Sequence, residues 1–203
     1  MVEVDEAQSR TATIAARWEA RRANSREMMS GHRDGSRAAP AKVSARRLAI
    51  SATRLVGFLE AWGAWDRARM GDEDIPRGDA PPVECLRPII GHHLLAVPRP
   101  EGAFTYRLVG QALRQLGWPE PLRGTQDMGD VTLRTLAETH YREAVEQRKP
   151  SLYEVTATCG DFTVVYERLA LPFGDREKVR FLLLGISIEA ARARDLRVVL
   201  VGR

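Results

Sequence analysis

The stretch that decides the fold is AFTYRLVGQALRQLGWPEPLRGT, residues 103–125. In its first part Phe104, Tyr106 and Leu108 alternate with more polar residues, and this two-residue period predicts a strand with one buried face. From Gln111 the apolar residues recur at helical spacing, until a glycine and two prolines end the helix. A strand that gives way to short helices and an irregular crossing predicts a lid over a pocket.

The positive charge of the chain is concentrated near its N-terminal end. Of the 203 residues, 1–54 hold 11 Lys or Arg against 6 Asp or Glu, a balance of +5, while the rest hold 20 against 21, a balance of −1. We expect residues 1–50 to form a basic, partly disordered leader. Because the remaining body is close to neutral, nucleic acid is a disfavoured partner.

The cytoplasm is the predicted location of the protein. The sequence has no apolar run of the roughly 20 residues that span a bilayer, and its first residues do not resemble a secretory signal. A membrane is therefore also a disfavoured partner.

Residues 51–70 are predicted to form an amphipathic helix. Its apolar stripe consists of Leu55, Phe58, Leu59, Trp62 and Trp65. So large an apolar area on one helix has to cover a sheet, a second copy of the chain, or both. We expect these five residues to form an interface, and we expect a homodimer.

Residues 71–190 contain five predicted strands around one longer helix. The strands are expected at 92–97, 104–109, 152–158, 163–173 and 179–189, the helix at 133–148, and a tail at 191–203. The first two strands form a hairpin. The last strand is apolar on both faces, so it should lie centrally, with the lid and the longer helix on one side and the Trp62/Trp65 helix on the other. The fold class is α+β.

This order of elements resembles that of a PAS domain, and the sequence is similar to a bacterial, nearly free-standing PAS subfamily. The matching segments follow in order from the Trp-bearing helix: Ile75-Pro76-Arg77, residues 86–90, Tyr106-Arg107-Leu108-Val109-Gly110, Leu122-Arg123-Gly124, the helix ending at Pro150, Tyr166-Glu167-Arg168-Leu169 with Leu171-Pro172, and residues 181–188. The resemblance implies a five-stranded antiparallel sheet with helices over one face. It also implies sensing of a small molecule or protein, and dimerisation through the helix ahead of the domain.

The expected ligand-binding residues are Tyr106, Leu108, His140, Tyr141, Tyr153 and Arg168. Arg168 offers a bidentate fork to a small polar or anionic ligand, although each of these residues taken alone is more often structural. The cofactor is left open. The resemblance places the proximal histidine of some heme-containing PAS domains in the helix of His140, but heme is the less favoured alternative, because a lone helical histidine is usually a core residue.

The favoured function is that of a sensory or adaptor protein in signal transduction, with an unidentified signalling protein and a small molecule as partners. No catalytic triad, P-loop or metal-ligand spacing is present, so an enzyme is not expected. One alternative is a small α+β enzyme with His140 and a nearby carboxylate as acid and base. Another is a nucleic-acid or membrane-associated regulator, whose salt-dependent binding would require residues 1–47.

Overall fold

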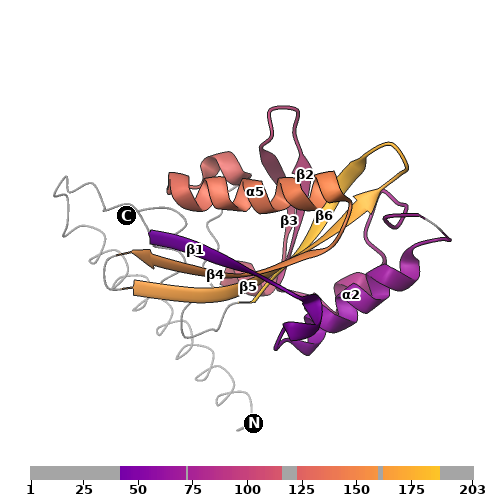
Figure 1. Cartoon of the computed structure of the whole chain (residues 1–203), viewed down its shortest axis with the longest axis horizontal. Helices are drawn as coiled ribbons and strands as arrows, with labels where there is room; N and C mark the ends of the chain where they lie inside the picture. The colour runs from indigo at the N-terminus through magenta and orange to yellow at the C-terminus, as the bar shows by residue number, and fades with distance from the viewer. Residues whose placement is uncertain (1–41, 72, 116–122, 160–161, 188–203) are drawn as a thin grey trace, which may run out of the picture. The chain divides into compact units, whose positions relative to one another are not determined.

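The computed structural model describes residues 42–187, except residues 72, 116–122 and 160–161. These residues belong to one compact unit, Ala38–Arg203. Its strands are β1 (Lys42–Leu48), β2 (His93–Pro98), β3 (Phe104–Val109), β4 (Ser151–Cys159), β5 (Phe162–Gly174) and β6 (Val179–Ile186). They form one antiparallel sheet of six strands in the order β1-β4-β5-β6-β2-β3 (Figure 1). The expected α+β class, the hairpin of β2 with β3 and the central place of β6 are confirmed.

Two helices of more than two turns cover this sheet, on opposite sides (Figure 1). The helices are η1 (Ile50–Ala52), α2 (Val56–Ala68), α3 (Val83–Leu86), η2 (Arg87–Ile89), α4 (Gln111–Gln115), η3 (Thr125–Asp127) and α5 (Val131–Gln147). Helix α5 begins where the Asp130 side chain accepts a hydrogen bond from the Leu133 amide at 2.8 Å, and it ends at Arg148, whose φ of 54° is left-handed. No helix in the described part of the chain is long and apolar enough to cross a membrane.

The expectation of five strands is wrong, because β1 adds a sixth. Its residues pair with β4 from Lys42 opposite Thr158 to Leu48 opposite Leu152. This strand lies in the stretch assigned to the disordered leader, so that assignment is corrected for residues 42–50, while residues 1–41 lie outside the described residues. An edge strand tolerates charged side chains. The arginines at 46 and 47 interrupt the alternation of apolar and polar residues, so the sequence does not show the pattern of a strand here.

The two faces of the sheet are covered by different helices. Successive residues of a strand point to opposite faces of the sheet, so Leu183 and Gly185 of β6 lie on one face and Leu184 lies on the other. Residues paired directly across the strands share a face. Helix α2 covers the first side, since a Cβ on Gly185 would lie 2.8 Å from the Phe58 ring. The Trp65 Nε1 donates to the carbonyl oxygen of Pro172 at 2.7 Å. The predicted cover on the back of β6 is therefore present, and it begins at Val56 rather than at residue 51.

Candidate functional site

A buried arginine lies at the centre of the sheet face that α5 covers. Arg168 is 3% exposed, and it pairs with Tyr153 of β4 and Ile186 of β6. Its Nη2 lies 2.5 Å from Nδ1 of His140, and its guanidinium carbon lies 5.0 Å from the centre of the Tyr141 ring. His140 and Tyr141 are neighbours on α5, so the helix packs directly onto the arginine.

A row of contacts leads from this arginine to the edge of the sheet. The His140 ring stacks on the Tyr153 ring, with centres 3.5 Å apart and planes 5° apart. The Tyr153 hydroxyl donates to the carboxylate of Glu143, and Glu143 also accepts from Arg47 of β1. The carboxylate nearest to His140 along this row is therefore bonded to a tyrosine and to a second arginine.

Burial and neighbouring charges move the pKa values of the imidazole and of three phenols in this region further from neutral pH. Burial, and then the positive charges of Arg168 and Arg47, lower the pKa of His140 to about 3. Burial raises the pKa of Tyr153 to about 12, that of Tyr106 well above its usual value, and that of Tyr166 as well. We call Arg168, His140, Tyr106, Tyr141, Tyr153 and Tyr166 the arginine cluster. Arg168 carries the only formal charge of the cluster, and Nδ1 of the neutral His140 accepts a hydrogen bond from the guanidinium.

The structure places five of the six expected ligand-binding residues in the arginine cluster, and it places Leu108 elsewhere. Leu108 is 40% exposed and pairs with Leu95, on the side of the sheet that α2 covers. The register of β2 and β3 shifts between Leu95 and Ala96, so Arg107 becomes an extra residue. This bulge reverses the alternation that put Tyr106 and Leu108 on one face, and the expected position of Leu108 is wrong for that reason.

Three residues of this region were missed in the sequence. Tyr166 precedes Arg168 by two residues in a strand and so shares its face, which the alternation could have shown. Glu143 follows His140 by three residues in α5, which places both on one side of the helix. Arg47 could not be found this way, because it lies in the stretch read as a leader.

The arrangement of His140 does not provide the acid–base pair of the enzyme alternative. That alternative requires an Asp or Glu within hydrogen-bond reach of the imidazole, and the observed partner of Nδ1 is the Arg168 guanidinium. A histidine whose pKa lies near 3 is also neutral at pH 7, so it is not the imidazolium that would act as a general acid. With Nδ1 accepting from Arg168, the neutral ring carries its proton on Nε2, so neither ring nitrogen offers a free lone pair to a metal.

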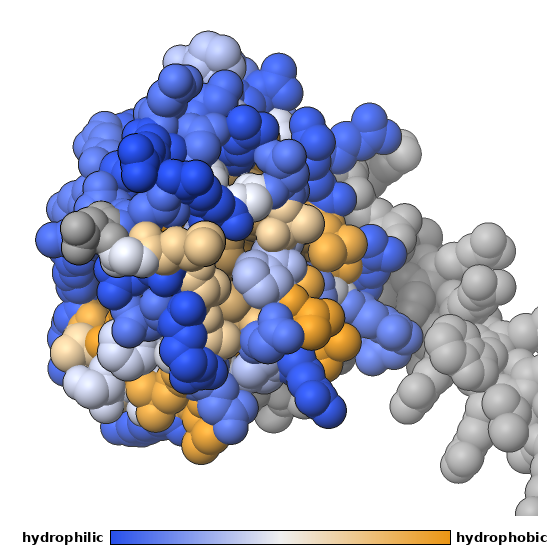
Figure 2. All heavy atoms as spheres, turned by 90° about the vertical axis from the view of Figure 1, so that its right-hand side faces the viewer, coloured by the Kyte–Doolittle hydropathy of each residue, from blue (hydrophilic) through white to orange (hydrophobic). Residues whose placement is uncertain are grey.

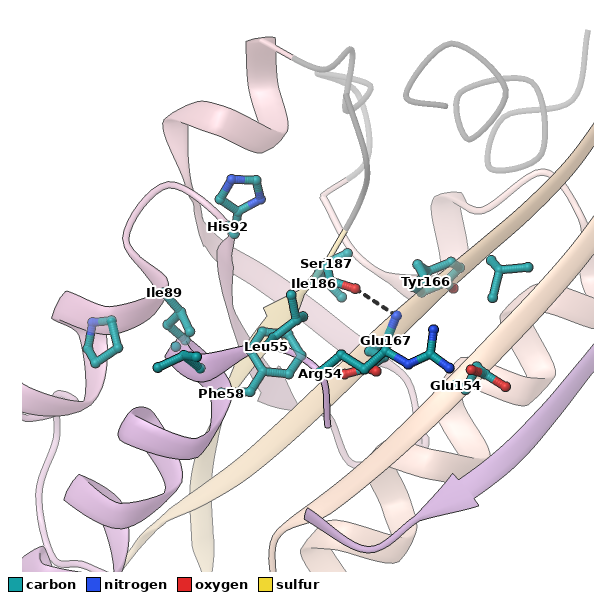
Figure 3. Close-up of a pocket in the computed structure, with 14 residues that line it drawn as sticks. Arg54, Leu55, Phe58, Ile89, His92, Glu154, Tyr166, Glu167, Ile186 and Ser187 are labelled. Carbon is teal, nitrogen blue, oxygen red and sulfur yellow. Dashed lines mark hydrogen bonds between the residues drawn. The ribbon is translucent and has the colours of Figure 1, made fainter. Parts of the chain in front are cut away.

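A second candidate site is an open groove of about 540 Å³ on the α2 side (Figure 3). One wall is apolar and comes from the start of α2, from η2 and from the end of β6. The other wall is polar and comes from β4 and β5. The labelled lining residues are Arg54, Leu55, Phe58, Ile89, His92, Glu154, Tyr166, Glu167, Ile186 and Ser187.

The two carboxylates of this groove already have partners. Glu167 accepts from the Thr53 hydroxyl, and its backbone amide donates to the Ser187 hydroxyl at 2.8 Å (Figure 3). Glu154 lies 3.0 Å from the Arg46 guanidinium. These bonds connect Thr53, directly after η1, to β5 and connect β1 to β4, and they engage both carboxylates of the groove.

The outer side of α2 and the segments beside it expose large apolar residues. Helix α2 packs against α3 and η2. The exposed fraction of the side chain is 67% for Val56, 36% for Trp62, 68% for Val83 and 72% for Ile90. Figure 2, which views the right-hand side of Figure 1, shows hydrophobic side chains gathered in a central band among hydrophilic ones. Of the five expected interface residues, Phe58 and Trp65 are buried against the chain's own sheet, Leu55 and Leu59 are half-buried, and Trp62 faces outward.

The chain matches no protein-family model, no curated protein and no solved structure.

Proposed function

We propose that this protein is a cytoplasmic sensory or adaptor protein built on a PAS-type domain. It binds a small ligand beneath α5 and signals to a partner protein by contact or by a change of dimerisation. The observation that carries this proposal is the buried Arg168 under α5, with an imidazole and tyrosines around it and with the guanidinium as the partner of His140 Nδ1.

The order of the elements supports the PAS assignment. Leaving β1 aside, the chain runs through two paired strands, the short helices α4 and η3, the longer helix α5, and three further strands. This is the order on which the resemblance rests, and the five strands are antiparallel, as a PAS domain requires. The sixth strand is an addition at the β4 edge.

The output surface in this proposal is the exposed apolar side of α2. Val56 and Trp62 are the large apolar residues that α2 exposes, and the helix is held to the central strands by Phe58 and Trp65. A second copy of the chain that packs here would bury these residues, which supplies the favourable free energy of association. Because α2 lies against β5 and β6, a displacement of those strands reaches the surface.

Native mass spectrometry of protein purified without added ligand tests this function, because it reports bound molecules and subunit number together. We expect a dimer whose population changes when the bound molecule is removed. Trp62→Glu combined with Val56→Glu should give a folded monomer, and Glu60→Gln, a polar change at an exposed position of the same helix, should leave the dimer intact. A wild-type monomer with nothing bound would refute the proposal.

A further inference from the structure

The charge of Arg168 has no counter-ion among the described residues. The ion pairs found in this part of the chain all involve other arginines, and the acids in them lie nearer the surface. The Nε of Arg168 is buried and has no hydrogen-bond partner among the described residues. Burial of an uncompensated charge costs several kcal/mol, so a bound anion would relieve a large penalty.

The neighbours of Arg168 do not replace an anion. Nδ1 of His140 accepts one hydrogen bond from Nη2, and the face of the Tyr141 ring gives a weak cation–π contact. Neither group is negatively charged, and the pKa of Tyr106 and that of Tyr166 are raised by burial. The cluster therefore offers one positive charge together with phenol hydroxyls close enough to interact with it electrostatically.

The surroundings of the guanidinium also indicate the chemistry of the ligand. A guanidinium presents adjacent N–H groups whose spacing matches the two oxygens of a carboxylate. The same sheet face carries Leu94, Ala96, Phe104 and Leu184, all buried in the core, so the surroundings of the guanidinium are apolar. In apolar surroundings a strongly hydrated inorganic anion such as phosphate has the larger cost of desolvation, which favours a carboxylate.

We propose that Arg168 anchors a small organic carboxylate beneath α5, with the free Nε–H and a neighbouring N–H donating to its two oxygens. This inference rests on the proposed function, because it specifies the ligand of the same site. His140 then acts as a positioning residue, since its hydrogen bond and its stacking on Tyr153 hold the guanidinium in place.

The test is thermal unfolding of the full chain at constant ionic strength, with acetate and benzoate as probes and acetamide and benzamide as their uncharged counterparts. We expect a carboxylate to raise the unfolding midpoint while its amide does not. Sodium chloride and sodium phosphate form the inorganic arm. A rise with these salts equal to that with carboxylates would overturn the assignment to an organic acid, as would no response to any anion.

Substitutions at Arg168 test whether this residue causes the rise of the unfolding midpoint. Arg168→Met should abolish the response to carboxylates, while Arg107→Met, at an exposed position of β3, should retain it. Arg168→Lys keeps the positive charge but lacks the two adjacent N–H donors of arginine. It should bind the carboxylate at least about 10-fold more weakly than the wild type. Should the methionine variant not fold, the lysine variant decides: unchanged affinity refutes the role of Arg168.

The outcomes separate this inference from the proposed function. An Arg168-dependent carboxylate that never alters subunit number would leave the site standing and count against sensing. A neutral molecule that co-purifies and alters subunit number would overturn the carboxylate and leave the sensor standing.

Discussion

At the scale of single residues, the contact between His140 and Arg168 decides what the α5 side of the sheet can do. A histidine beside a buried guanidinium must stay neutral, and it then serves as an acceptor. The pairing replaces the carboxylate that usually accompanies a buried arginine, and so it leaves the positive charge available to a ligand.

The burial of His140, together with the charges of Arg168 and Arg47, makes the stability of the fold depend on pH. The unfolded chain binds a proton at His140 near pH 6.5, whereas the folded chain binds it only near pH 3. Between these values the unfolded state holds more protons, so the stabilisation is complete above pH 6.5 and is lost as the pH falls.

We therefore expect the free energy of unfolding of the wild type to fall by up to ~1.4 kcal/mol per pH unit more steeply than that of His140→Gln, from pH 6.5 down to about pH 4. Glutamine keeps an acceptor for Arg168 but does not titrate. Urea titrations at several pH values measure this difference, and His92→Gln, in the open groove, is the matched control. Parallel curves for wild type and His140→Gln would contradict it.

At the scale of elements, α2 is held to the sheet by one face and exposes the other. The same residue type occurs at two levels of burial on neighbouring turns, since Trp65 is 3% exposed and donates to Pro172, while Trp62, three residues earlier, is 36% exposed. The same substitution can therefore be compared at a buried position and at a more exposed position of one helix.

Trp65→Phe should lower the free energy of unfolding by about 2 kcal/mol, because it leaves a cavity and removes the donor to a buried carbonyl. Trp62→Phe should change it by less than about 0.5 kcal/mol. Chemical denaturation of the two variants provides the measurement. Equal losses would mean that Trp65 does not fix α2 to the sheet.

The elements that could be predicted from the sequence are those whose pattern is local. The alternation in the β3 stretch and the two apolar faces of β6 identified strands, and the spacing of Phe58 and Trp65 identified a helix. β1 was missed because edge strands need no apolar face. The bulge that displaced Leu108 also left no local pattern, because it arises from the pairing of two strands.

The arginine cluster was only partly predictable for a similar reason. Tyr153 and Arg168 could be assigned to strand faces, but their contacts with α5 join residues far apart in the chain. His140 and Arg168 are separated by 28 positions, and nothing local states that the two side chains meet. The contact exists because α5 crosses the sheet above β4 and β5.

At the scale of the whole molecule, stability should decrease from the centre of the sheet to its edges. β6 has a paired strand on each side, and the sheet around it is covered by α5 and α2 on opposite faces. β1 lies at one edge with one paired strand, and its residues are at most half-buried.

Amide hydrogen exchange should therefore be slowest in β5 and β6 and clearly faster in β1, because edge strands open without disrupting the core. Mass spectrometry of peptides from these strands measures the order. Protection of β1 equal to that of β6 would mean that the sixth strand is an integral part of the cooperative unit.

The row of side chains from Arg168 to Arg47 connects the central strand β5 to the edge strand β1. Arg47 belongs to the strand that immediately follows residues 1–41 in the chain. A displacement of that strand would act first on Glu143. It would then act on the stacked rings of Tyr153 and His140, and finally on the Arg168 guanidinium. The chain thus has a side-chain connection between this strand and its interior in addition to the hydrogen bonds of the sheet.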